Sequence, residues 1–287
     1  MQSNNPVFRR SEEFRAGGAH QTYAGNGSTY QGYGADPSTW GTGAPGTPGQ
    51  LEAPPSSGPM TIDSVVQKTA ISLGVVILAA LATWIMTPEI GLSPTSEDLS
   101  PLIAAMTIGG LGAFALSMVN SFKRVVSPAL VIAFAVLEGV ALGALSKFFN
   151  AFYEGNIVMG AVIGTFAAFA GTLAAYKFFN IQVGAKFRKF VIAAVFGMIG
   201  LSLMELLLSA FDAQIGLFGV SGLGMVTAFA GLVLGIFMLI LDFDFVEQGI
   251  ANGLPERESW RAAFAMTVSL VWIYTNLLRI LAFFSQD

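Results

Sequence analysis

The sequence predicts an all-α polytopic membrane protein, in which a bundle of seven transmembrane helices follows a disordered N-terminal tail. Hydrophobic residues make up 54% of the 287 residues and charged residues only 11%, whereas a soluble domain carries about 25% charged residues. After Lys68, seven stretches are each about as long as the hydrocarbon layer of a membrane is thick. These stretches lack the polar alternation of membrane β-strands, so their backbone must satisfy its own hydrogen bonds in helices.

The predicted spans form one domain, residues 61–287. They cover about residues 65–88, 100–122, 126–148, 155–178, 188–211, 217–243 and 260–284. Each is at or above the roughly 18 to 20 residues that a membrane-crossing helix needs. No short apolar region with a small-residue cleavage site precedes them, so we expect the first span to act as an uncleaved signal-anchor.

Residues 1–60 are rich in Gly, Ser, Pro, Thr and Tyr and poor in aliphatic residues. Such a composition cannot bury a core, and we interpret the segment as a disordered tail that solvates or tethers the domain. A partner-binding role for its Tyr and Trp residues is the alternative. We expect order to begin near Thr61, where Asp63 or Ser64 can cap the first helix.

Basic residues predict the orientation, because Lys and Arg are retained on the cytoplasmic side of a membrane. A cytoplasmic tail places twelve of them inside and only Lys147 and Arg279 outside. The twelve are Arg9, Arg10, Arg15, Lys68, Lys123, Arg124, Lys177, Lys186, Arg188, Lys189, Arg257 and Arg261. Seven spans then leave the C-terminus external.

Several classes of function are disfavoured by what the sequence lacks. The net charge of −4 argues against a nucleic-acid partner. The single histidine, His20, lies in the tail and cysteine is absent, which removes His-based and Cys-based metal sites and a Ser-His protease from the bundle. No Walker or dinucleotide-binding glycine motif occurs either. We therefore expect that the protein is not an enzyme.

Charged residues inside a span are costly and normally have a partner or a task. Glu138 lies ~16 Å from the cytoplasmic end of its span, close to the midplane, and marks a candidate ion path. Glu205 and Arg279 lie at similar depths of ~22 Å and ~26 Å on two different helices. The sequence thus predicts a buried Glu205–Arg279 charge pair. The alternative is that Arg279 extends to the outer headgroups.

Two aspartates, Asp242 and Asp244, end the sixth uncharged run, and Glu247 follows about one turn later. Carboxylates this close in a partly dry site can share a proton or hold a hard cation such as calcium. Asp242 and Asp244 are therefore candidate pH-sensing and calcium-binding residues at the cytoplasmic mouth. The alternative is an ordinary polar helix end in headgroup water.

Small residues four positions apart allow close helix packing in lipid. Three such pairs are present, Gly139 with Gly143, Gly160 with Gly164, and Gly231 with Gly235. We interpret all three as packing positions.

Several motifs in order resemble the Bax-inhibitor-like (transmembrane Bax-inhibitor-motif) family. They are the third span "SPALVIAFAVLEGVALGALS", the end of the sixth, "LILDFDFVEQG", and the last, "LVWIYTNLLRILAFF". The opening "NPVFRR" and the segment "MTIDSVVQKTA" look like the bacterial, actinobacterial branch of that family. The resemblance covers residues 60–285 and the first ten.

The resemblance implies six helices around a central, polar seventh, and a pH-sensitive calcium leak in the bacterial inner membrane. In the family, two aspartates that share a proton gate the leak, one at the cytoplasmic end of the sixth helix and one in the seventh. Asp242 matches the first, and alignment on "NLLR" places Ser269 at the second. We expect a slow pH-sensitive cation leak, with calcium as the transported or bound ion and no other cofactor. The alternative is a non-conducting stress regulator that binds membrane proteins such as proteases.

Overall fold

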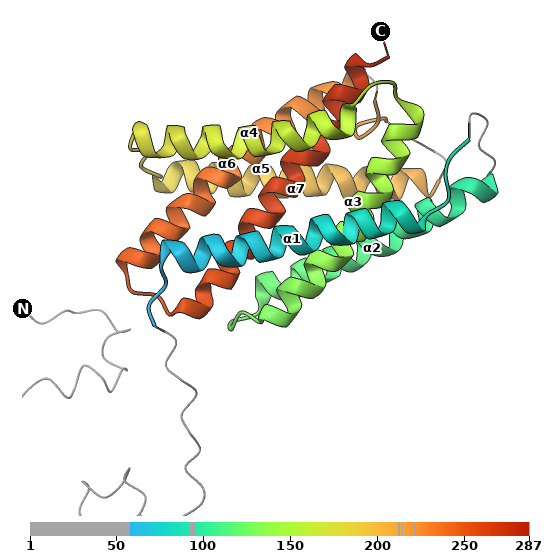
Figure 1. Cartoon of the computed structure of the whole chain (residues 1–287). Helices are drawn as coiled ribbons and strands as arrows, with labels where there is room; N and C mark the ends of the chain where they lie inside the picture. Colours follow the sequence, from blue (N-terminus) through green and yellow to red (C-terminus); the bar gives the residue numbers. More distant parts are fainter. Residues whose placement is uncertain (1–57, 92–95, 212, 214, 221, 287) are drawn as a thin grey trace, which may run out of the picture. The chain divides into compact units, whose positions relative to one another are not determined.

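The computed structural model describes residues 58–91, 96–211, 213, 215–220 and 222–286, and seven long helices make up most of this part of the chain (Figure 1). They are α1 (Ile62–Met86), α2 (Ser96–Phe122), α3 (Pro128–Phe152), α4 (Ile157–Phe178), α5 (Ala185–Ser209), α6 (Gly222–Ala251) and α7 (Ser259–Phe284), with a 3-10 turn η3 (Glu256–Glu258) before α7. All seven are long and apolar enough to cross a membrane. The predicted all-α seven-helix fold is confirmed. Residues 1–57 of the predicted tail lie outside the described residues.

Helix α1 begins at Ile62, after Thr61 as its N-cap. The Thr61 hydroxyl accepts the Ser64 N–H at 3.1 Å, and the Ser64 hydroxyl accepts the Thr61 N–H at 3.1 Å. The cap is therefore Thr61, two positions before Asp63 and three before Ser64, and Ser64 completes a capping box. The fold also extends to residues assigned to the tail, because Met60 is 1% exposed and its N–H donates to Leu254 O at 2.7 Å.

Helix α6 differs most from its predicted span, 217–243. It begins five residues later and continues to Ala251, so Asp242 and Asp244 lie inside the helix, about two turns before its end. The helix therefore continues eight residues beyond the predicted end of the span, residue 243. Counting an uncharged run stops at the first acid, whereas Phe243, Val246 and other apolar residues continue the core-facing side of the helix.

Helix α7 occupies the centre of the bundle, packed against α1, α3, α4 and α6 (Figure 1). Helix α2 packs mainly on α3, and α5 mainly on α6. The expectation of six helices around a seventh therefore holds for four of them, with α2 and α5 further out. The seventh helix is polar as expected, with Ser259, Thr267, Ser269 and Asn276 among its buried residues.

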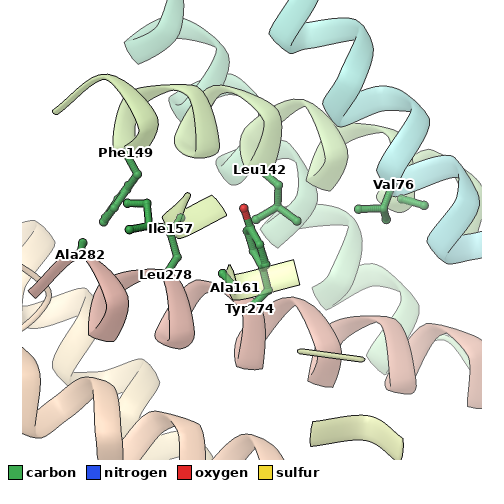
Figure 2. Packing of buried hydrophobic residues seen from close by; sticks show 9 residues of the cluster. Val76, Leu142, Phe149, Ile157, Ala161, Tyr274, Leu278 and Ala282 are labelled. Atoms are coloured by element: carbon green, nitrogen blue, oxygen red, sulfur yellow. The ribbon is translucent and has the colours of Figure 1, made fainter. Parts of the chain in front are cut away.

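One core cluster shows how α7 is held (Figure 2). Tyr274 and Leu278 of α7 pack with Leu142 of α3 and Ala161 of α4. The Tyr274 hydroxyl lies 2.6 Å from the hydroxyl of Ser146, which itself donates to Leu142 O. The buried hydroxyls are thus satisfied within the core.

Glycines bring α3 against the backbone of α1. A Cβ at Gly139 would collide with Val76 O, and a Cβ at Gly143 with Ala80 O. The predicted packing role of this pair is confirmed. At the other two pairs the neighbours are side chains of α7, namely Asn276 and Ile273 for Gly231 and Gly235, and Leu281 and Leu277 for Gly160 and Gly164.

Candidate functional site at the carboxyl end of helix α6

Asp242 of α6 and Ser269 of α7 meet between the two helices. The Ser269 hydroxyl donates to Asp242 Oδ2 at 2.6 Å, and Ser269 is only 1% exposed. The structure therefore brings together the two residues that the family motifs aligned with a gating pair. Among the described residues, no cation pairs with Asp242, so its partner is a neutral hydroxyl.

Asp244 points to a different helix, because residues two apart on an α-helix face nearly opposite sides. Its Oδ2 accepts Arg188 Nη2 of α5 at 2.7 Å and Gln248 Nε2, one turn further along α6, at 2.8 Å. Asp244 is 7% exposed, whereas the Arg188 side chain is 47% exposed. The pair ties the start of α5 to α6.

Glu247 makes the third link, since its Oε2 accepts the Tyr176 hydroxyl of α4 at 2.6 Å. The three acids thus bind three different helices. Among the described residues, no group of three or more His, Cys, Asp or Glu is arranged to hold a metal ion. The partners Arg188 of Asp244 and Tyr176 of Glu247 were not predicted from the sequence. Only the contact with Gln248, four residues after Asp244, could be expected from helical spacing.

Glu138 lies on α3, partly buried and close to the core residues Phe134, Ala135 and Leu142. It makes no hydrogen bond or ion pair with any residue that the structure describes. The structure therefore does not join it to Asp242 or Ser269, and it stays a separate carboxyl on an inward helix face.

At the opposite end of the bundle, Arg279 binds backbone groups of the α5–α6 loop and the start of α6. Its Nη2 donates to Leu217 O at 2.9 Å, to Gly224 O at 2.8 Å and to the Thr227 hydroxyl at 3.0 Å. Non-helical backbone at membrane depth needs such internal partners. Arg279 therefore binds carbonyl groups of the protein.

Glu205 binds the same loop, because its Oε1 accepts the Gly216 N–H at 2.8 Å. No ion pair joins it to Arg279 among the described residues. The predicted direct pair is replaced by two separate contacts with the loop, whose backbone offers both donors and acceptors. Within the described part of the chain, Glu205 Oε2 and Arg279 Nε are buried without a hydrogen-bond partner.

Comparison with known families agrees with the geometry. A family model described as Bax inhibitor 1 like matches residues 5–286, which is almost the whole chain. A search of curated proteins gave no match. With seven membrane-spanning helices and a match of this extent, the chain belongs to the Bax inhibitor 1 like family of membrane proteins.

Proposed function

We propose that this protein mediates or regulates a slow, pH-sensitive leak of cations, with calcium as the ion, and that it catalyses no reaction. We place it in a bacterial inner membrane with its N-terminus cytoplasmic and its C-terminus external, because of the distribution of Lys and Arg. The observation that carries the proposal is the hydrogen bond from Ser269 of α7 to Asp242 of α6.

An ionised Asp242 only accepts hydrogen bonds, whereas a protonated Asp242 can also donate one. A proton taken up at this carboxyl therefore changes how α6 holds the central helix α7. Since Ser269 offers a single neutral hydroxyl, the response is shallower than that of two carboxylates sharing a proton.

Asp242 is better suited to this role than Asp244. Protonation of Asp244 would leave the Arg188 guanidinium without its counter-charge, whereas protonation of Asp242 leaves no cation unpaired. Glu138 supports an ion path through the bundle as well, because it is an inward-facing carboxyl without a partner among the described residues.

The test is calcium flux into liposomes that contain the purified protein, from about pH 5 to about pH 8. We expect the flux of the wild type to vary with pH and that of Asp242→Asn to be constant. Asp244→Asn is the matched control, one carboxylate removed two residues away, and should keep the pH response. Equal pH profiles for wild type and Asp242→Asn would refute the role of Asp242.

A second candidate is a non-conducting regulator that binds other membrane proteins, including proteases. The observation in its favour is that Ser269, and not a carboxylate, faces Asp242. A wild-type flux equal to that of protein-free liposomes at every pH would make this the better function.

A further inference from the structure

A pocket opens at the end of the bundle opposite Asp242. The carboxyl-terminal part of α5 forms one wall, and the loop before α6 forms the other. Its lining residues are Ser202, Glu205, Leu206, Ser209, Gly216, Phe218 and Gly219, and its volume is about 400 Å³. This space is enough for an ion together with part of its water shell.

Glu205 lines this pocket and carries an unsatisfied carboxylate oxygen. Its Oε1 accepts the Gly216 N–H, while Oε2 is buried and has no hydrogen-bond partner among the residues that the structure describes. A carboxylate oxygen without a partner is expensive to bury, particularly in a membrane-spanning domain. A cation bound to Oε2 would offset that cost.

Two hydroxyl groups on the same face of α5 add further acceptor oxygens to the pocket. Ser202 donates its proton to Met198 O at 2.9 Å, and Ser209 donates to Leu206 O at 2.8 Å. Because a hydroxyl has one proton and two lone pairs, both oxygens keep only acceptor capacity for the pocket. Residues 202, 205 and 209 follow the spacing of one helix face. The pocket therefore suits a cation and disfavours an anion.

Arg279 limits how tightly a cation can bind. Its guanidinium lies 5.3 Å from the ring centre of Phe218, which also lines the pocket. The guanidinium donates to Leu217 O, Gly224 O and Thr227, so its positive charge stays close to the loop. Glu205 is the one carboxylate among the described lining residues, and with a positive charge nearby we expect weak binding, in the range of roughly 0.1 to 1 mM or weaker.

We propose that this pocket is a low-affinity site for a hard cation, with Glu205 Oε2 and the hydroxyl oxygens of Ser202 and Ser209 as protein ligands and water completing the shell. The site would hold calcium before it passes toward Asp242. The passage of calcium toward Asp242 rests on the proposed function, whereas cation binding in the pocket does not.

Binding is tested with calcium alone as the probe, by measuring the thermal unfolding temperature of the purified full chain in detergent as calcium is added. A ligand that binds the folded state raises this temperature. Glu205→Gln keeps an oxygen for the Gly216 N–H but loses the charge, and we expect it to weaken calcium binding at least about tenfold, since ligand charge sets the affinity of such sites.

Two further variants keep the test sharp. The double variant Ser202→Ala with Ser209→Ala should weaken binding by a smaller factor, and it covers the case in which Glu205→Gln does not fold. Glu154→Gln, an exposed acid after α3 at the same end of the bundle, is the matched control and should bind as the wild type does. Calcium stabilisation that is absent in the wild type, or unchanged in the pocket variants, would overturn the proposal.

Flux measurements separate this proposal from the proposed function. If calcium stabilises the protein through Glu205 but the wild type shows no flux in liposomes, the cation site is supported and the calcium leak is refuted. If the flux depends on Asp242 but calcium gives no stabilisation that depends on Glu205, the calcium leak is supported and the cation site is refuted.

Discussion

Glu205 accepts the N–H of Gly216 and Arg279 donates to the carbonyl of Leu217, so two charged side chains from different helices bind neighbouring residues of one loop. Residues 215–220 of the loop are apolar, yet their backbone is not helical. Each charged side chain therefore satisfies a backbone group outside the regular hydrogen bonds of the helices. This arrangement differs from a direct ion pair in what each mutation removes.

Replacing Arg279 should cost much more stability than replacing Glu205. Arg279→Met takes a donor from two carbonyls and the Thr227 hydroxyl, and we expect a loss of about 2 kcal/mol or more. Glu205→Gln still accepts from Gly216 and should lose less than about 1 kcal/mol. Thermal unfolding in detergent measures both. Equal losses that are largely restored in the double variant would instead indicate a direct pair.

Introducing a second carboxylate should sharpen the pH response of the proposed leak. In Ser269→Asp, two carboxylates would face each other and share one proton, so their titrations become coupled. We expect a steeper change of calcium flux with pH in liposomes than for the wild type. Ser269→Ala, which removes the hydroxyl without adding charge, is the control and should flatten the change. A Ser269→Asp profile that matches the wild type would argue against the α6–α7 link as the sensor.

The Arg188–Asp244 ion pair should contribute about 1 kcal/mol or less, because the Arg188 side chain is 47% exposed to solvent. A double-mutant cycle with Arg188→Gln and Asp244→Asn measures the coupling from unfolding free energies. Added salt should lower it, since exposed charges are screened. Lys189→Gln, next to Arg188, provides the control and should show no coupling to Asp244→Asn. Coupling well above this value would mean that the guanidinium is less hydrated than its exposure indicates.

Adding one methyl group at Gly143 should separate α1 from α3. The Cβ of Gly143→Ala would meet the backbone of Ala80, which cannot rotate away, and we expect a loss of roughly 1 to 3 kcal/mol. Gly110→Ala on α2 is the matched control, because its Cβ would meet nothing within 4 Å. That variant should be stabilised by roughly 0.5 to 1 kcal/mol through helix propensity. Similar unfolding temperatures for the two variants would contradict the backbone contact.

Reporter fusions test the proposed orientation. A reporter fused after residue 60 should be cytoplasmic, and one fused after Asp287 should be external, because seven spans place the ends on opposite sides. The asymmetry of Lys and Arg favours this orientation over its inverse. A cytoplasmic signal from the C-terminal fusion would contradict it.

The sequence predicted the number and kind of the helices because lipid leaves the backbone few alternatives. It was less informative where a tertiary contact replaces a local one. The loop around Leu217 is as apolar as a span, and side chains distant in sequence, Glu205 and Arg279, bind its irregular backbone. The start of α6 was therefore predicted five residues too early.

At the candidate site, the Asp242–Ser269 contact was anticipated from family motifs, since no spacing rule connects positions 27 residues apart. Arg188 and Tyr176 were not anticipated as partners of α6, because they lie 56 and 71 residues from the acids they bind. Such contacts depend on which helix faces which, and a single sequence carries no direct record of that.

The glycine contact between α1 and α3 also determines which parts of the bundle can move. With backbone against backbone at Gly139 and Gly143, these helices have no side chains between them that could change rotamer and let them slide. A rearrangement must therefore move other helices relative to the α1–α3 pair. Helix α5 is the most separable part, since Val191 is the one residue of α5 that is buried and its polar contacts are concentrated near its two ends. Those two ends carry Arg188 beside Asp244 and Glu205 beside the pocket, so a swing of α5 would act on both candidate sites at once.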